Sequence, residues 1–186
     1  MEKKSFIGYL KITLLVIYVL SLGLFIWKGN FLGISMGIFG IATVIILGYI
    51  NKRMPNLVDR NLFVVLNLFV FFASLLGSSF NFYDIPHYDD FLHVWSGFIA
   101  VAAGFSILKA LNPTTKFTPL FTIVFLVMFS LGVGATWEMV EFFMDTFAHT
   151  NMQVGGLLDT MIDMLDGLAG TIVMVIILWI KKDIRS

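Results

Sequence analysis

Residues 159–180 read DTMIDMLDGLAGTIVMVIILWI, and this stretch decides how the rest of the chain is interpreted. About 20 predominantly apolar residues in a helix cross the hydrocarbon core of a bilayer, so the stretch is long enough to span a membrane. It nevertheless begins with three aspartates, Asp159, Asp163 and Asp166, whose i, i+4, i+7 spacing puts them on one stripe of a helix. The stretch therefore predicts a transmembrane helix with an acidic stripe near one end.

Other segments of the 186-residue chain have the same length and apolar character. The six predicted spans cover residues 6–27, 31–50, 61–80, 91–111, 119–143 and 159–180. The composition agrees, because 59% of the residues are hydrophobic and 13% are charged, whereas a soluble domain has roughly 45–50% apolar and about 25% charged residues. We expect an all-α fold, a polytopic six-helix transmembrane bundle that contacts membrane lipids.

Lysines and arginines gather at one edge of these spans. On that side lie Lys3, Lys4, Lys52, Arg53, Arg60, Lys109, Lys116, Lys181, Lys182 and Arg185. Lys28 lies on the other side, and Lys11 sits near the start of the first span, where its long side chain can reach back to the lysine-rich edge. Because short cytoplasmic loops carry the excess of basic residues, we expect a multi-pass protein of the plasma membrane with both termini in the cytoplasm.

Most carboxylates and all three histidines fall at the opposite edge. They are Asp84, Asp89, Asp90, Glu138, Glu141, Asp145, Asp159, Asp163, Asp166, His87, His93 and His149. At about 1.5 Å of rise per residue, His93, Glu138 and Asp163 each lie roughly 24–28 Å from the far end of their spans, and so share one shallow layer. The predicted orientation makes this layer face outward, at the ends of the last three spans.

A simple explanation accounts for only part of this acidic layer. Aspartates at helix N-termini are favoured by capping and by the helix dipole, which explains Asp89, Asp90 and Asp159. Capping does not explain Glu138, Glu141 and Asp145, because they lie near the C-terminal end of their span, where negative charge is disfavoured. Nor does it explain Asp163 and Asp166, which lie inside the sixth span. Acids within a membrane are costly and usually functional, and Lys28 is the one basic residue on that side. A bound cation, shared protons or a water-filled cleft would compensate.

The residue types in this layer favour particular chemistry. We expect the metal ligands to be Asp89, His93, Glu138, Asp163 and Asp166. Carboxylates with one imidazole suit Mg²⁺, Ca²⁺ or Mn²⁺, with Zn²⁺ or Fe²⁺ possible if His93 is a ligand. The candidate catalytic residues are Glu138, Glu141 and Asp159, with Glu141 or Asp159 as general base.

Several classes of site are excluded or lack support. The chain has no cysteine, which excludes disulfides and thiolate metal sites. It contains no HExxH, Walker A or glycine-rich dinucleotide motif. Its formal net charge of +0 gives no indication of nucleic acid binding.

The charge distribution also predicts how the chain is organised. We expect one integral membrane domain over residues 1–186, with residues 1–83 as a scaffold and residues 84–186 as the part that bears the site. Small residues predict close helix packing. They are Gly33, Gly37 and Gly40 in the second span, Gly132, Gly134 and Ala135 in the fifth, and Gly167 and Gly170 in the sixth.

A set of motifs at the acidic ends of the last three spans resembles a known family. The motifs are Tyr88-Asp89, His93 and Gly97-Phe98; Glu138 and Glu141; and Asp159-Thr160, Asp163-Met164 and Gly170. Over residues 84–171 they resemble the YjdF-like family of uncharacterised bacterial inner-membrane proteins. More remotely, their order is similar to that of the VanZ-like membrane proteins linked to glycopeptide resistance, in which an asparagine usually stands where this chain has Asp166.

Three functions follow as hypotheses. The first is a membrane-embedded enzyme or binding protein for a lipid or envelope headgroup, with a cation held by Glu138, Asp163 and His93 that orients phosphate or activates water. The second is a small cation- or proton-coupled transporter, against which stands the lack of a polar path inward from Asp166 to Lys181. The third is a non-catalytic assembly protein of the cell envelope.

Overall fold

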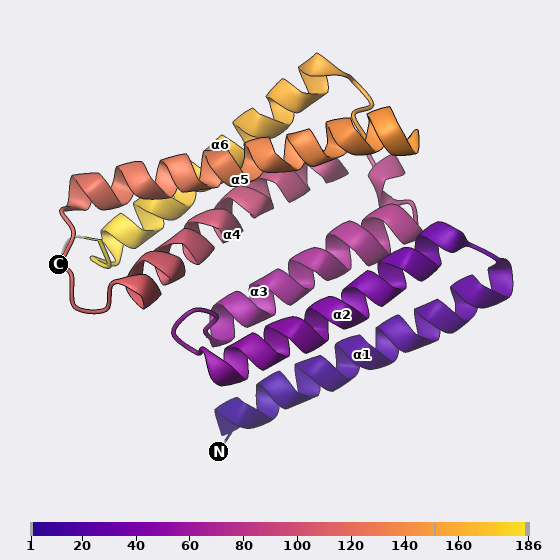
Figure 1. Cartoon of the computed structure of the whole chain (residues 1–186), viewed down its shortest axis with the longest axis horizontal. Coiled ribbons are helices and arrows are strands. Elements are labelled where there is room, and N and C mark those ends of the chain that lie inside the picture. Colours follow the sequence, from indigo (N-terminus) through magenta and orange to yellow (C-terminus); the bar gives the residue numbers. More distant parts are fainter. Residues whose placement is uncertain (1, 151, 185–186) are drawn as a thin grey trace. The chain divides into compact units, whose positions relative to one another are not determined.

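The computed structural model describes residues 2–150 and 152–184, and these residues form helices and connecting turns without a strand. The helices are α1 (Glu2–Lys28), α2 (Phe31–Arg53), α3 (Arg60–Val70), the π-helix η1 (Phe71–Ser79), the 3₁₀ helix η2 (Phe82–Asp84), α4 (Tyr88–Leu111), α5 (Pro119–Ala148) and α6 (Leu157–Ile180) (Figure 1). Since η1 continues α3, the described residues contain six helices long and apolar enough to cross a membrane. The predicted all-α, six-span fold is confirmed.

The chain divides into two compact units, Met1–Tyr88 and Asp89–Ser186. The first unit contains α1, α2 and the continuous α3–η1 span, and the second contains α5, α6 and nearly all of α4. The grouping of residues 1–186 into one domain with a scaffold part and a site-bearing part stays a prediction.

In the first unit, α1 packs along a row of buried glycines on α2. A Cβ on Gly33 would meet the ring of Phe25, and a Cβ on Gly40 would meet the ring of Tyr18. Gly37 lies in ordinary contact with Leu22. The close packing predicted for these three glycines is confirmed, and α1 and α2 lie side by side in Figure 1.

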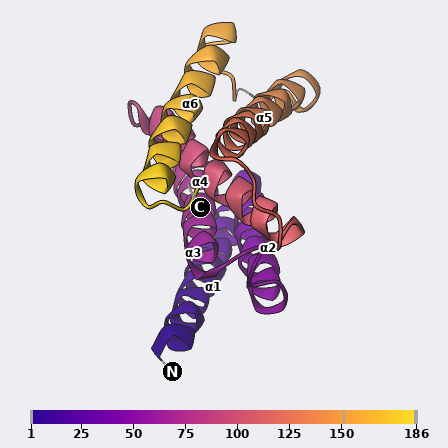
Figure 2. The same cartoon turned by 90° about the vertical axis from the view of Figure 1, so that its left-hand side faces the viewer.

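In the second unit, glycines let α4 and α6 meet backbone to backbone. A Cβ at Gly97 would overlap the carbonyl oxygen of Gly167, and a Cβ at Gly170 would overlap the carbonyl oxygen of Val94. Only glycine permits so close an approach. The remaining helix of this unit, α5, packs with Phe129 against Gly104 of α4, and Figure 2 shows α5 and α6 on the two sides of α4.

The packing prediction is wrong for the two glycines of α5. Nothing lies within 4 Å of a Cβ built on Gly132 or Gly134, so neither marks a helix contact. The reason is that a small residue permits an approach but does not require one. Gly134 instead borders a small cavity at the candidate site.

The helices also extend beyond the predicted spans at their acidic ends. α4 begins at Tyr88 rather than at residue 91, α5 continues to Ala148 rather than ending at residue 143, and α6 begins at Leu157. Asp89, Asp90 and Asp145 therefore lie on regular helix, which fixes the directions of their side chains.

Candidate functional site

Asp163 is the residue on which the acidic groups of the second unit converge. It lies on the second turn of α6 and is 2% exposed. Three sets of side chains each bring one potential ligand atom per residue within 4.8 Å of the others, and Asp163 belongs to all three sets. The sets are Asp89, His93 and Asp163; Asp90, Asp163 and Asp166; and Glu138, Glu141 and Asp163.

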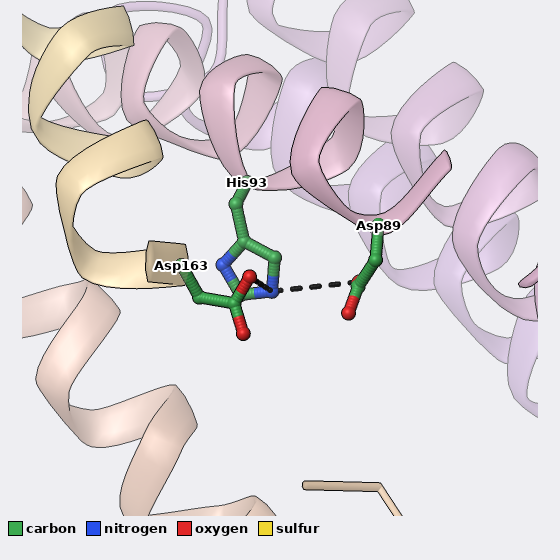
Figure 3. A group of neighbouring side chains, drawn as sticks. All are labelled: Asp89, His93 and Asp163. Atoms are coloured by element: carbon green, nitrogen blue, oxygen red, sulfur yellow. Dashed lines mark ion pairs between the residues drawn. The ribbon is translucent and has the colours of Figure 1, made fainter. Parts of the chain in front are cut away.

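One side of Asp163 faces His93 of α4. The His93 Nε2 atom lies 3.8 Å from Asp163 Oδ1 and 3.5 Å from Asp89 Oδ1, so the imidazole sits between two carboxylates (Figure 3). Asp89 and His93 are four residues apart on α4, which places them on the same face of the helix. His93 is buried, at 8% exposure, whereas the Asp89 side chain is 37% exposed. The imidazole of His93 therefore lies between the buried carboxylate of Asp163 and the partly exposed carboxylate of Asp89.

The glutamates of α5 complete the buried part of the cluster. Glu138 and Glu141 are each 6% exposed. Glu141 Oε1 accepts a hydrogen bond of 2.7 Å from Trp137 Nε1. Among the described residues, Glu138 Oε2 and Asp163 Oδ2 are buried and have no hydrogen-bond partner. A buried carboxylate oxygen without a partner is energetically costly, so these two atoms need a cation, a proton or a water molecule.

A small cavity lies beside these atoms. His93, Ser130, Gly134, Glu138, Asp163 and Gly167 are among its lining residues. The volume open to the centre of a water molecule is about 20 Å³. One water molecule needs roughly 10–15 Å³ by this measure, so the space suits a water or a single ion.

The helix positions explain why these side chains meet. His93 lies one turn before Gly97 on α4, and Asp163 lies one turn before Gly167 on α6. Because Gly97 and Gly167 are in backbone contact, the preceding turns of the two helices are also close. The Ser96 hydroxyl donates to the His93 carbonyl oxygen at 2.7 Å, within the same turn.

Asp145 has a different role from the one its position in the acidic stripe indicates. It accepts hydrogen bonds from the Thr150 hydroxyl at 2.6 Å and from the backbone N–H groups of Met152 and Gln153 at 2.8 and 2.9 Å. By accepting these hydrogen bonds, Asp145 orders the connection from α5 to α6. This role accounts for a carboxylate near the C-terminal end of α5. Sequence reasoning missed this because two of the three donors are backbone groups, which carry no residue signature.

Gln153 is a further residue that sequence reasoning missed. Its side-chain amide donates to the Thr160 hydroxyl at 2.8 Å and to the Glu138 carbonyl oxygen at 3.4 Å. It thereby joins α5 to the first turn of α6 beside the cluster. A lone glutamine in a loop gives no signal for such a contact.

The other predicted residues are less deeply placed. Asp166 is half-buried, and one of the three sets joins it with Asp90 and Asp163. Asp159 is half-buried on the first turn of α6 and belongs to none of the sets found in the described part of the chain. His149 ends α5 in a left-handed conformation with φ of 54°.

No lysine described in the second unit is placed to neutralise the cluster. Lys109 lies in the last turn of α4, Lys116 lies in the connection between α4 and α5, and Lys181 and Lys182 follow α6. Lys109 lies sixteen positions after His93 on α4, a rise of about 24 Å.

Comparison with known proteins gives a family but no activity. A family model described as "Predicted membrane protein (DUF2238)" matches residues 9–183. An uncharacterised protein of Thermotoga maritima is 32% identical over 122 residues, which are 64% of this chain and 62% of that protein. The chain thus matches less than two thirds of that relative's length. No solved structure matches the chain. These matches are consistent with the resemblance to YjdF-like proteins, whereas the remoter likeness to VanZ-like proteins stays a prediction.

Proposed function

Since this chain belongs to the predicted membrane protein family DUF2238, we propose that it is a multi-pass membrane protein that binds a cation between α4, α5 and α6. The proposed ligands are Glu138, Glu141 and Asp163, with His93 and Asp89 at the more accessible side. The site lies on the membrane side opposite the lysine-rich ends of the helices, which the positive-inside rule makes the exterior of the cell.

The two unpartnered oxygens of Glu138 and Asp163 carry the proposal. Three carboxylates whose oxygens lie within 4.8 Å repel one another when all are ionised. A divalent cation removes that repulsion and supplies the missing partner of both oxygens in one step. The surrounding oxygen atoms favour Mg²⁺, Ca²⁺ or Mn²⁺, and the imidazole of His93 also admits Zn²⁺.

A second question is how a headgroup would reach the bound cation. We expect a lipid or envelope headgroup to approach the cation from the side of Asp89, whose side chain is partly exposed. Such a headgroup would be held through its phosphate oxygens. A catalytic role for Glu138, Glu141 and Asp159 stays a prediction, and Glu141 already accepts a hydrogen bond from Trp137.

Metal analysis of the purified protein tests the proposal. Wild-type protein, prepared without chelator, is expected to carry at least one equivalent of a divalent cation, and Glu138→Gln and Asp163→Asn are expected to lose it. Asp183→Asn is the matched control because Asp183 is exposed beyond the other end of α6. Wild-type protein that holds no divalent cation, and takes up none at millimolar concentration, would remove the proposal.

A second function, cation- or proton-coupled transport, is favoured by one observation. The Ser130 and Thr171 hydroxyls form a buried hydrogen bond of 2.6 Å, and Ser130 lines the cavity. Each lies eight residues from Glu138 or Asp163, about 12 Å deeper along its helix. The Ser130–Thr171 pair therefore places polar groups deeper in the membrane span, in a region where the sequence has no charged residue. Cation-driven flux into liposomes that Ser130→Ala and Thr171→Val abolish would favour transport over a binding protein or enzyme.

The third hypothesis, an assembly protein of the cell envelope, makes a different prediction. Its acids would be dispensable, so a variant with Glu138, Glu141 and Asp163 changed to Gln or Asn would fold and support the same phenotype as the wild type.

A further inference from the structure

The two oxygens of Asp163 have different surroundings, and from this we infer that Asp163 bridges two divalent cations. The inference rests on the proposed function, because it takes the same cluster and assigns it a second cation. The inner position is formed by Glu138, Glu141 and Asp163, and the outer position by Asp89, His93 and Asp163.

The geometry of the Asp163 carboxylate is the first step. Its Oδ1 atom faces the imidazole of His93 at 3.8 Å. Its Oδ2 atom is one of two buried oxygens of the described cluster that have no hydrogen-bond partner, and the other is Glu138 Oε2. His93, Glu138 and Asp163 line the same cavity, which has room for one of the two ions. We therefore assign Oδ1 to the outer set, which contains His93, and the unpartnered Oδ2 to the inner set, so that Asp163 would act as a bridging carboxylate.

Both positions offer enough ligands to hold an ion. In each set, one atom from each of three residues lies within 4.8 Å of the others. The inner set is fully buried and consists of oxygen atoms, whereas the outer set includes an imidazole and the partly exposed Asp89. Two-metal sites hold their ions about 3.5–4 Å apart, a separation that one bridging carboxylate spans.

Charge balance supports two cations rather than one. The two positions together contain four carboxylates, Asp89, Glu138, Glu141 and Asp163, with a formal charge of −4. Two divalent cations bring that charge to zero, whereas one leaves two uncompensated negative charges in a mostly buried site. The lysines described in this unit lie at the opposite ends of α4 and α6 or in the connection between α4 and α5, and give no compensation.

The remaining set, Asp90, Asp163 and Asp166, does not call for a third ion. Asp90 and Asp166 are half-buried, so water reaches their charges. Neither residue has a buried oxygen without a hydrogen-bond partner among the described residues.

The ligand chemistry makes Mn²⁺ a suitable probe for both positions. Carboxylate oxygens suit Mg²⁺, Ca²⁺ and Mn²⁺, and the outer imidazole favours a transition metal. Mn²⁺ belongs to both groups. It is also paramagnetic, so two bound ions that share a carboxylate interact magnetically and are distinguished from one isolated ion.

The test is a calorimetric titration of the chelator-treated, detergent-purified full chain with Mn²⁺. We expect two Mn²⁺ per wild-type chain. His93→Gln and Glu141→Gln are each expected to keep one, and Asp163→Asn to lose both or bind at least tenfold more weakly. Asp183→Asn, the matched control, is expected to keep two.

Any other number of bound Mn²⁺ ions contradicts the two-cation inference. One Mn²⁺ per wild-type chain overturns the bridge and leaves the proposed function standing, whereas no Mn²⁺ overturns both. Should the variants fail to fold, the electron paramagnetic resonance spectrum of Mn²⁺-loaded wild-type protein is sufficient. A spin-coupled spectrum supports the bridge, and the spectrum of isolated Mn²⁺ at saturation overturns it.

Discussion

Gly97 of α4 lies so close to Gly167 of α6 that a Cβ at position 97 would overlap the Gly167 carbonyl oxygen. The two helices run in the same direction from the acidic end to the lysine-rich end (Figure 1). The crossing therefore fixes the distance between the turns that precede it, and those turns carry His93 and Asp163. A backbone contact between two glycines thus positions the polar cluster.

Substituting Gly97 by alanine is expected to destabilise the second unit. The added methyl group meets backbone that cannot rotate away, and overpacking of this kind costs about 1–3 kcal/mol. Gly132→Ala is the matched control, because nothing lies within 4 Å of a Cβ there and the helix gains propensity. Denaturant unfolding in detergent measures the difference. A Gly97→Ala protein as stable as the control would show that α4 and α6 are not in backbone contact.

Trp137→Phe is expected to weaken cation binding without abolishing it. The substitution removes the N–H group that donates to Glu141 Oε1 at 2.7 Å and so frees that carboxylate to rotate. Loss of a group that orients a ligand typically lowers metal affinity about 10–100-fold. The measurement is the Mn²⁺ dissociation constant, with Trp179→Phe, near the other end of α6, as control. Equal affinities in the two variants would argue against Glu141 as a ligand.

Removing the cation is expected to lower the thermal stability of the wild-type protein. A ligand that binds only the folded state at 100 times its dissociation constant stabilises by about 2.7 kcal/mol. A chelator should therefore shift the melting temperature of wild-type protein downward and leave that of Asp163→Asn unchanged. A chelator effect of equal size on both proteins would place its cause outside the cluster.

Asp145→Ala is expected to loosen the connection between α5 and α6 while cation binding continues. Three donors lose their acceptor, from Thr150, Met152 and Gln153. Limited proteolysis should cut the variant faster in this connection than Asp183→Asn. Loss of the cation in Asp145→Ala would instead give this residue a part in the site.

Single-cysteine labelling tests the predicted orientation, and the natural absence of cysteine makes the chain ready for it. Val154 and Lys116 are both exposed, in the connections that follow α5 and α4 respectively. A membrane-impermeant maleimide is expected to label Val154→Cys in intact cells and Lys116→Cys only after permeabilisation. The reverse pattern would place the acidic cluster on the cytoplasmic side.

The six spans were predictable from sequence because the signal is local. An apolar run such as residues 31–50 needs no knowledge of its neighbours to be identified as a membrane helix. The stripe of Asp159, Asp163 and Asp166 follows from helical periodicity in the same way, and so does the pairing of Asp89 with His93.

What sequence did not predict depends on how each helix is rotated and where its loops return. Asp145 and Glu138 have the same character in the sequence, yet one orders a loop and the other lies buried in the cluster. Gly134 and Gly97 are equally small, but only Gly97 meets another backbone. The Ser130–Thr171 hydrogen bond joins residues 41 positions apart, and no periodicity relates them.

The central claim, a cation held between Glu138 and Asp163, is tested most directly by an anomalous difference map from Mn²⁺-soaked crystals. The account predicts a peak at coordination distance from Glu138 Oε2 and Asp163 Oδ2, absent from crystals of Asp163→Asn. A wild-type map with no peak at this cluster, in crystals that bind Mn²⁺ elsewhere, would contradict it.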